Sequence, residues 1–179
     1  MSQPGPTLTT ERLVLHPPSL ADFEDFAALC SDPNAMHMIG GPQVRPVAWR
    51  TFMQTAGSWA VYGYGFFMVR ERATGAMVGR VGTHQPDGWP GTEVGWALHG
   101  QAQGNGYATE AASAAMDWAF DHLGWSEVIH CIDAANEPSM AVARRLGSRV
   151  LRTAMLPEPI NRETVCWGQS AEAWRARRD

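Results

Sequence analysis

The sequence contains no lysine, and all 14 of its basic residues are arginines. This absence excludes two classes of enzyme: those that hold a nucleotide with a P-loop lysine and those that form a Schiff base. Cysteine is also scarce, with only Cys30, Cys131 and Cys166 and no CxxC pair among them. An odd count without paired spacing favours neither a disulfide framework nor a cysteine zinc site, and it predicts a reducing, cytoplasmic setting.

Long apolar runs are absent as well. No run approaches 18 residues, and the first residues lack the basic and apolar regions of a secretory signal, so we expect no contact with a membrane. The formal net charge of −4 argues against nucleic acid as the main partner. The six histidines show no metal-binding spacing, so we expect no metal.

The composition is that of one globular domain. The chain has 179 residues, of which 45% are hydrophobic and 18% are charged. We expect residues 1–7 to form a flexible tail and residues 8–179 to form a single domain. The prolines between residues 31 and 48 predict an irregular excursion.

Hydrophobic periodicity predicts an α/β (α+β) chain with a mixed sheet. Expected strands cover residues 12–16, 65–70, 77–84, 92–98, 126–133, 149–155 and 164–168. Expected helices cover residues 20–29, 49–60, 106–123, 137–146 and 171–178.

The segment Gln101–Glu110 lies between an expected strand and the long helix, and it contains Gly104 and Gly106. Free N–H groups and the helix dipole meet at such a helix start, which predicts an anion site. A dinucleotide on a Rossmann unit is one candidate ligand, because Asp133 ends the next strand where a ribose-binding acid would lie. However, Thr109 occupies the third glycine position, and only one βαβ unit is present.

The same loop resembles a known family. Gln103-Gly-Asn-Gly-Tyr-Ala108 is similar to the pyrophosphate loop of the GNAT N-acetyltransferases. Gly104–Ala111, Thr10–Leu15 and Asn136-x-x-Ser139 followed by Arg145-Leu-Gly147 resemble the RimJ/RimL-like branch. The matches occur in family order over nearly the whole chain.

The resemblance implies a GNAT-like mixed, mostly antiparallel sheet, with a splayed central strand pair flanked by helices. Acetyl-CoA would be the cosubstrate, held in the cleft between the strands at 92–98 and 126–133. Its expected contacts are Trp96, Ala97 and Leu98 on the strand, Gln103, Gly104, Asn105, Gly106, Tyr107, Ala108 and Thr109 in the loop, and Asn136.

The implied reaction is direct attack of a primary amine on the thioester in a ternary complex. Glu93 is the candidate base, and Ser139 is the candidate proton donor beside the sulfur. A backbone N–H near Trp96 or Ala97 would stabilise the charge on the carbonyl oxygen. The residues alone leave a structural alternative open for each: an ordinary solvated edge charge for Glu93, and a capping residue at a helix start for Ser139.

The acceptor would be a protein N-terminal α-amine or a small-molecule amine, and the resemblance allows a homodimer. His84 and His99 are further candidates to face the cleft. Four aromatic residues are candidates for an acceptor wall, although core positions are more common for such residues: Trp49, Trp59, Tyr64 and Trp89. The alternative function is a non-catalytic acyl-CoA-binding or sensory domain of the same fold.

Overall fold

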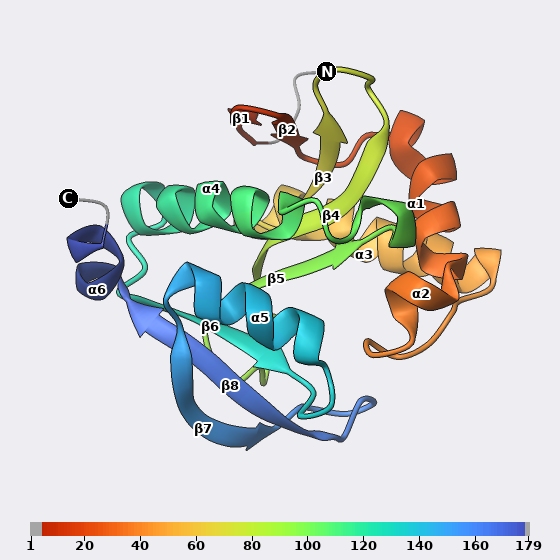
Figure 1. The fold of residues 1–179 in the computed structure, drawn as a ribbon. Coiled ribbons are helices and arrows are strands. Elements are labelled where there is room, and N and C mark those ends of the chain that lie inside the picture. Colours follow the sequence, from red (N-terminus) through yellow and green to blue (C-terminus); the bar gives the residue numbers. More distant parts are fainter. Residues whose placement is uncertain (1–4, 178–179) are drawn as a thin grey trace.

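The computed structural model describes residues 5–177, and these form one eight-stranded sheet with helices on both faces (Figure 1). The strand order is β1-β2-β3-β4-β5-β6-β8-β7. The strands are β1 (Leu8–Thr9), β2 (Leu13–His16), β3 (Phe66–Glu71), β4 (Met77–His84), β5 (Glu93–Leu98), β6 (Glu127–Ile132), β7 (Arg149–Met155) and β8 (Glu163–Ser170). The β5–β6 pair is parallel and its neighbours are antiparallel, so the expected mixed, mostly antiparallel sheet is confirmed.

The helices are α1 (Phe23–Ser31), α2 (Pro33–Met36), α3 (Arg45–Tyr62), α4 (Tyr107–His122), α5 (Glu137–Leu146) and α6 (Ala171–Ala176), with short 3₁₀ turns at Leu20–Asp22 and Gly100–Ala102. One core lies between α4 and the strands. There Ala111, Ala112 and Ala115 have no exposed surface, and their small side chains let the helix approach the sheet closely. A second core joins α1, α3 and Met68 on the opposite face.

The prediction of an irregular segment over residues 31–48 is wrong in two places. Pro33 begins α2, where the carboxylate of Asp32 accepts a hydrogen bond from the Asn34 N–H at 2.8 Å. Pro46 lies in the first turn of α3, which begins four residues before the expected start. A proline in the first turn removes an N–H that has no helical partner, so these prolines start helices rather than break them.

The chain termini differ slightly from expectation. Residues 1–4 of the expected tail lie outside the described residues, and a flexible tail over residues 5–7 stays a prediction. The two-residue strand β1 pairs with β2 and was not expected from the sequence. Within residues 5–177, no helix combines the length and the apolar character needed to cross a membrane.

Candidate active site

The central strands β5 and β6 part almost as soon as they meet. They share a single register pair, Glu93 with Ile129, where the Ile129 N–H donates to the Thr92 carbonyl oxygen at 2.8 Å. The Thr92 hydroxyl donates to the Glu127 carbonyl oxygen at 2.6 Å, which closes the narrow end. Residues 94–98 therefore run along a gap rather than beside a partner strand.

A histidine side chain fills the start of this gap. Nδ1 of His130 donates to the Val94 carbonyl oxygen at 2.6 Å, and Nε2 accepts from the Ser148 hydroxyl at 3.0 Å. Gln169 in turn donates to Ser148. Burial lowers the pKa of His130 to about 4, so the ring is neutral at pH 7 and can act as donor on one side and acceptor on the other. Sequence reasoning missed His130, because its role depends on three distant strands and loops.

The free edge of β5 presents alternate residues to the gap. The Val94 carbonyl points there, and the strand period of two places the N–H and C=O groups of Trp96 and Leu98 on the same edge. The side-chain amide of Gln103 donates to the Leu98 carbonyl at 3.2 Å. The backbone of Ala97 instead faces β4, where it is opposite Arg80. Of the two expected sources of an N–H beside the gap, the geometry therefore favours Trp96.

Glu93 lies at the narrow end of the gap and is only 7% exposed. Its carboxylate accepts from the indole N–H of Trp89 at 2.6 Å and from the Cys131 N–H of β6 at 2.8 Å. Burial nevertheless dominates and raises the pKa of Glu93 to about 7, while these hydrogen bonds oppose the shift. A carboxyl group with this pKa exchanges protons at neutral pH, unlike an ordinary edge charge.

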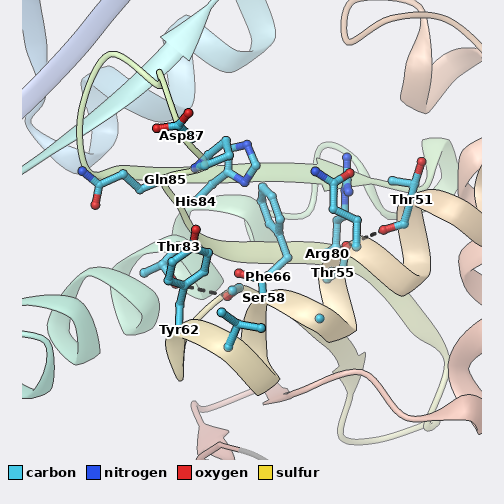
Figure 2. A pocket seen from close by; sticks show the side chains of 15 residues that line it. Thr51, Thr55, Ser58, Tyr62, Phe66, Arg80, Thr83, His84, Gln85 and Asp87 are labelled. Atoms are coloured by element: carbon cyan, nitrogen blue, oxygen red, sulfur yellow. Dashed lines mark hydrogen bonds between the residues drawn. The ribbon is translucent and has the colours of Figure 1, made fainter. Parts of the chain in front are cut away.

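A pocket of about 350 Å³ lies on the α3 side of the sheet, on the same face as Glu93 (Figure 2). Phe66, Arg80 and His84 line it. The ring centres of His84 and Trp89 are 4.7 Å apart. Because the Trp89 indole donates to Glu93, this contact connects the pocket to Glu93. Of the four aromatic candidates for an acceptor wall, Trp89 connects the pocket to Glu93, and Tyr64 stacks on Tyr62, which lines the pocket. Trp59, by contrast, is 1% exposed and belongs to the core.

Ser139 lies on the opposite face of β5 from Glu93. Its hydroxyl oxygen accepts from the indole N–H of Trp96 at 3.2 Å, and its backbone N–H donates to the Asn136 side chain at 3.1 Å. Residues 93 and 96 differ by an odd number along the strand, so their side chains leave β5 on opposite faces. The structure thus places the candidate base and the candidate proton donor on the two sides of one strand edge.

The glycine loop ends at the start of α4 with groups that have no partner in the described residues. Gly104 and Gly106 have φ values of 79° and 80°, and open space faces Gly104. No acceptor from residues 5–177 meets the N–H groups of Tyr107, Ala108 and Thr109, and the buried Thr109 hydroxyl also lacks a partner there. This donor set fits the pyrophosphate of a coenzyme A molecule.

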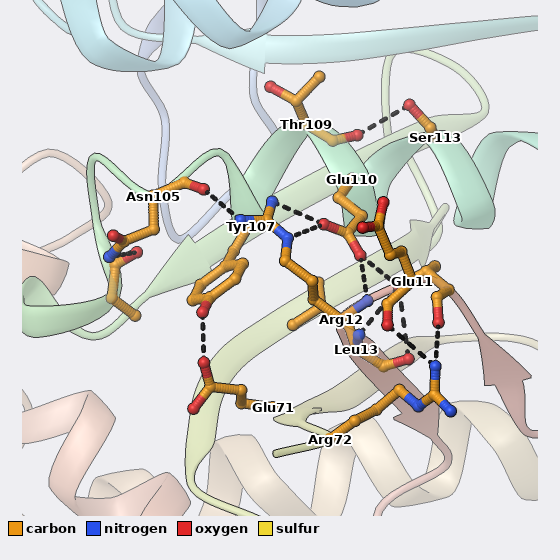
Figure 3. Close-up of polar contacts among 12 residues, drawn as sticks. Glu11, Arg12, Leu13, Glu71, Arg72, Asn105, Tyr107, Thr109, Glu110 and Ser113 are labelled. Atoms are coloured by element: carbon orange, nitrogen blue, oxygen red, sulfur yellow. Dashed lines mark hydrogen bonds and ion pairs between the residues drawn. The ribbon is translucent and has the colours of Figure 1, made fainter. Parts of the chain in front are cut away.

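The loop is braced from behind by Arg12, in the turn before β2, and by Glu71, at the end of β3 (Figure 3). Arg12 donates to the Asn105 carbonyl at 3.0 Å and forms an ion pair with Glu110 at 2.7 Å. The Tyr107 hydroxyl donates to Glu71 at 2.5 Å, so it points away from the gap. Arg12 is a second residue that sequence reasoning missed, although the motif around it was part of the resemblance. The Asn105 amide donates to carbonyls of its own loop.

Comparison with known proteins agrees with this geometry. The family model for the acetyltransferase (GNAT) domain matches residues 12–149. An acetyltransferase from Agrobacterium tumefaciens superposes with a TM-score of 0.81 at 34% identity, covering 92% of this chain and 94% of that one. The N-acetyltransferase YnaD of Bacillus subtilis is 26% identical over 143 residues, which is 79% of this chain and 82% of YnaD.

The fold likeness extends to more distant structures. The ribosomal-protein-S5-alanine acetyltransferase from Vibrio fischeri superposes with a TM-score of 0.73 at 17% identity, covering 94% of this chain and 98% of that one. This likeness shows that the two proteins share a fold. The matched domain, the parting strands and the glycine loop lead to one conclusion: the chain belongs to the GNAT acetyltransferase family.

Proposed function

We propose that this protein transfers the acetyl group of acetyl-CoA to a primary amine, by direct attack in a ternary complex. The observation that carries the proposal is the gap between β5 and β6, which exposes a backbone edge beside the unpartnered N-terminus of α4. A pantetheine arm can pair with such an edge as an added strand would. The alternative of a non-catalytic acyl-CoA-binding domain shares this gap and differs only in turnover.

The cosubstrate would be held at three places. The amides of residues 104–109 and the Thr109 hydroxyl would bind the pyrophosphate, since the Gln103 N–H already donates to the Gly100 carbonyl at 3.3 Å. The edge at Trp96 and Leu98 would pair with the pantetheine arm, and the amide of Asn136 would contact it, because its Oδ1 alone is used in capping α5. When bound, acetyl-CoA supplies an acetyl group activated as a thioester.

Glu93 would remove the proton from the attacking amine, directly or through a water molecule. Its pKa of about 7 leaves a substantial carboxylate fraction at neutral pH. An α-amine, with a pKa of about 8, is already partly neutral at this pH, whereas a lysine amine with a pKa near 10.4 is not. A base of this strength therefore suits an α-amine.

Two groups would assist at the thioester. The Trp96 N–H would donate to the carbonyl oxygen as negative charge develops on it. The Ser139 hydroxyl oxygen already accepts from the Trp96 indole, so its own proton is available for a hydrogen bond to the departing sulfur. The carbon–nitrogen bond forms, the carbon–sulfur bond breaks and the amine proton passes to Glu93. The sulfur leaves as a thiolate that Ser139 stabilises and that takes its proton from water.

Thermal unfolding with acetyl-CoA, CoA and NADH at equal concentrations tests the cosubstrate. A ligand at 100 times its dissociation constant adds about 2.7 kcal/mol of stability. We expect a shift with both coenzyme A compounds and none with NADH; a shift with NADH alone would support the Rossmann alternative. Release of free thiol with primary amines then separates an enzyme from a non-catalytic binding domain. Dimer formation and a cytoplasmic location remain proposals.

A further inference from the structure

Arg80 is a cation without an anionic partner. It extends from β4 into the pocket beside α3, and no carboxylate or hydrogen-bond acceptor among residues 5–177 pairs with its guanidinium. Its described neighbours are the buried thiol of Cys30 and two aromatic faces: the guanidinium carbon lies 4.8 Å from the ring centre of Phe66 and 5.7 Å from that of Phe26. The pocket therefore contains a positive charge that the described protein does not neutralise.

A guanidinium in this position has unused binding capacity. Arginine keeps its charge at every physiological pH and carries five N–H donors, in a planar fork that matches a carboxylate. Aromatic faces stabilise the charge but accept no conventional hydrogen bond. Buried or half-buried polar groups normally have partners, so an unpartnered guanidinium facing a cavity indicates that a ligand supplies one.

Arg80 is the group in the pocket best suited to bind an anion. The hydroxyls of Thr55, Ser58 and Thr83 donate to backbone carbonyls, so their protons are committed. Burial, followed by the charge of Arg80, lowers the pKa of His84 to about 4, so this ring is neutral at pH 7. Among the residues that line the pocket, Arg80 is therefore the cation. Asp87 is exposed at the opposite end, beyond His84 (Figure 2).

A continuous row of side chains joins Arg80 to Glu93. Phe66 lies between Arg80 and His84, and the ring centres of Phe66 and His84 are 5.3 Å apart. His84 in turn contacts Trp89, whose indole N–H donates to Glu93. In the β4–β5 register, this face of the sheet carries Arg80 and Ala97, then two glycines opposite each other, then His84 and Glu93.

The glycine pair leaves the floor of this row without side chains. A Cβ at Gly95 would lie 3.3 Å from the Phe66 ring and 3.6 Å from the Glu93 carboxylate, so the floor borders both groups. The position opposite Glu93 is His84, four residues further along β4 than Arg80, which is about 13 Å along the strand. A molecule that reaches both side chains needs its anionic group several bonds away from its amine.

We propose that this pocket binds the amine acceptor and that Arg80 pairs with a carboxylate on it, several bonds from the reacting amine. The proposal rests on the acetyl transfer proposed above and specifies its substrate class. The carboxylate can belong to a small molecule the size of a dipeptide or to an acidic side chain near a peptide N-terminus. Both sources present the same chemistry to Arg80.

Two matched pairs of probes test this choice, with the same glycine amine throughout. Glycyl-alanine and glycyl-alaninamide form the small-molecule arm, and Gly-Asp-Gly-amide and Gly-Asn-Gly-amide form the peptide arm. Binding to the full protein with CoA present is measured by calorimetry, and thiol release with acetyl-CoA is measured separately. We expect the carboxylate member of at least one pair to bind at least ten-fold more tightly than its neutral partner.

Arg80→Leu should abolish this preference, and Arg80→Lys should keep part of it, because lysine retains the charge without the planar fork. Arg50→Leu is the matched control, since Arg50 is exposed on α3 and does not line the pocket. Equal binding of charged and neutral members by the unaltered protein, or binding of none of the four, would overturn the proposal. Failure of the proposed function is distinct: coenzyme A compounds would then cause no thermal shift.

Discussion

The imidazole of His130 and the carbonyl of Val94 lie 2.6 Å apart, at the point where β5 and β6 stop pairing. A backbone N–H would occupy this position if the ladder continued. The ring satisfies the Val94 carbonyl while keeping β6 at the distance of a side chain, and Ser148 fixes the ring from its other side. A buried, neutral side chain thus separates β5 from β6 at the start of the gap.

Replacement of this histidine should therefore affect both stability and cosubstrate binding. His130→Leu leaves the Val94 carbonyl and the Ser148 hydroxyl without this partner, at about 1–3 kcal/mol for each buried group. We expect unfolding in urea to show a loss of about 2–4 kcal/mol, and calorimetry to show at least ten-fold weaker binding of acetyl-CoA. Ile132→Val on the same strand, which alters only packing, should lower stability without this loss of affinity. Unchanged affinity in His130→Leu would exclude His130 from shaping the gap.

Glu93→Gln should change how activity depends on pH. In the unaltered protein, kcat/KM expressed per neutral amine should rise with pH and level off above about 7, the pKa of Glu93. The variant should lose this limb and fall about 100-fold at pH 8, because glutamine accepts no proton from the amine. Glu127→Gln, an exposed carboxylate change on β6, should retain the profile. An unchanged profile in Glu93→Gln would mean that another base acts.

The same residue gives a stability signature with the opposite direction in pH. Because folding raises the pKa of Glu93 from 4.5 to about 7, the native state binds more protons than the unfolded chain in this range. The stabilisation from protonated Glu93 is complete below pH 4.5 and is lost as pH rises through 7. The loss amounts to about 3 kcal/mol. Urea midpoints should therefore fall more between pH 5 and 8 in the unaltered protein than in Glu93→Gln.

The sequence predicted what local patterns encode. Gly104 and Gly106 predict the loop, and the spacing of apolar residues predicts α4. The helix begins within one residue of the expected start. The resemblance directed attention to Glu93 and Ser139, and the structure places them on opposite faces of β5. The prediction of an irregular segment over residues 31–48 was wrong because it rested on prolines. The effect of a proline depends on whether it lies inside a helix or in its first turn.

Other parts of the site depend on contacts that no local pattern contains. Arg12 contacts Glu110, which is 98 positions away in the sequence. Arg80 became a candidate binding residue only because no acid lies near it among the described residues. His130 resembles any polar residue in a buried strand until its neighbours are known. Periodicity shows which face of a strand is buried, but it cannot show which distant group a side chain on that face will meet.

Gly106→Val should distort the pyrophosphate loop. Gly106 has a φ of 80°, which strains a β-branched residue, and a Cβ there would lie 3.5 Å from the Arg12 guanidinium that braces the loop from behind. We expect at least 30-fold weaker binding of acetyl-CoA by calorimetry. Gly124→Val controls for backbone strain, because Gly124 has a φ of 67° with open space around it and lies beyond the other end of α4. Equal effects of the two changes would show that strain, and not the loop, is responsible.

Arg12→Gln should loosen the same loop from behind. The change removes the ion pair to Glu110 and the hydrogen bond to the Asn105 carbonyl, so the loop must be ordered when the cosubstrate binds. We expect the KM for acetyl-CoA to rise about three- to ten-fold with little change in kcat. Arg72→Gln is the control, since Arg72 donates to the carbonyls of Thr10 and Glu11 but does not touch the loop. A similar rise in both variants would contradict the bracing role.

Ser139→Ala separates a role at the sulfur from a role in the helix start. Asn136 caps α5 through the backbone N–H of residue 139, so alanine leaves the cap intact and removes only the hydroxyl. We expect kcat to fall about ten-fold with little change in the dissociation constant of acetyl-CoA, because the hydrogen bond to sulfur matters most when negative charge develops on the departing thiolate. Ser139→Thr keeps a hydroxyl and should recover most of the activity. Should Ser139→Ala lower the unfolding temperature and leave kcat intact, Ser139 would only anchor the Trp96 indole.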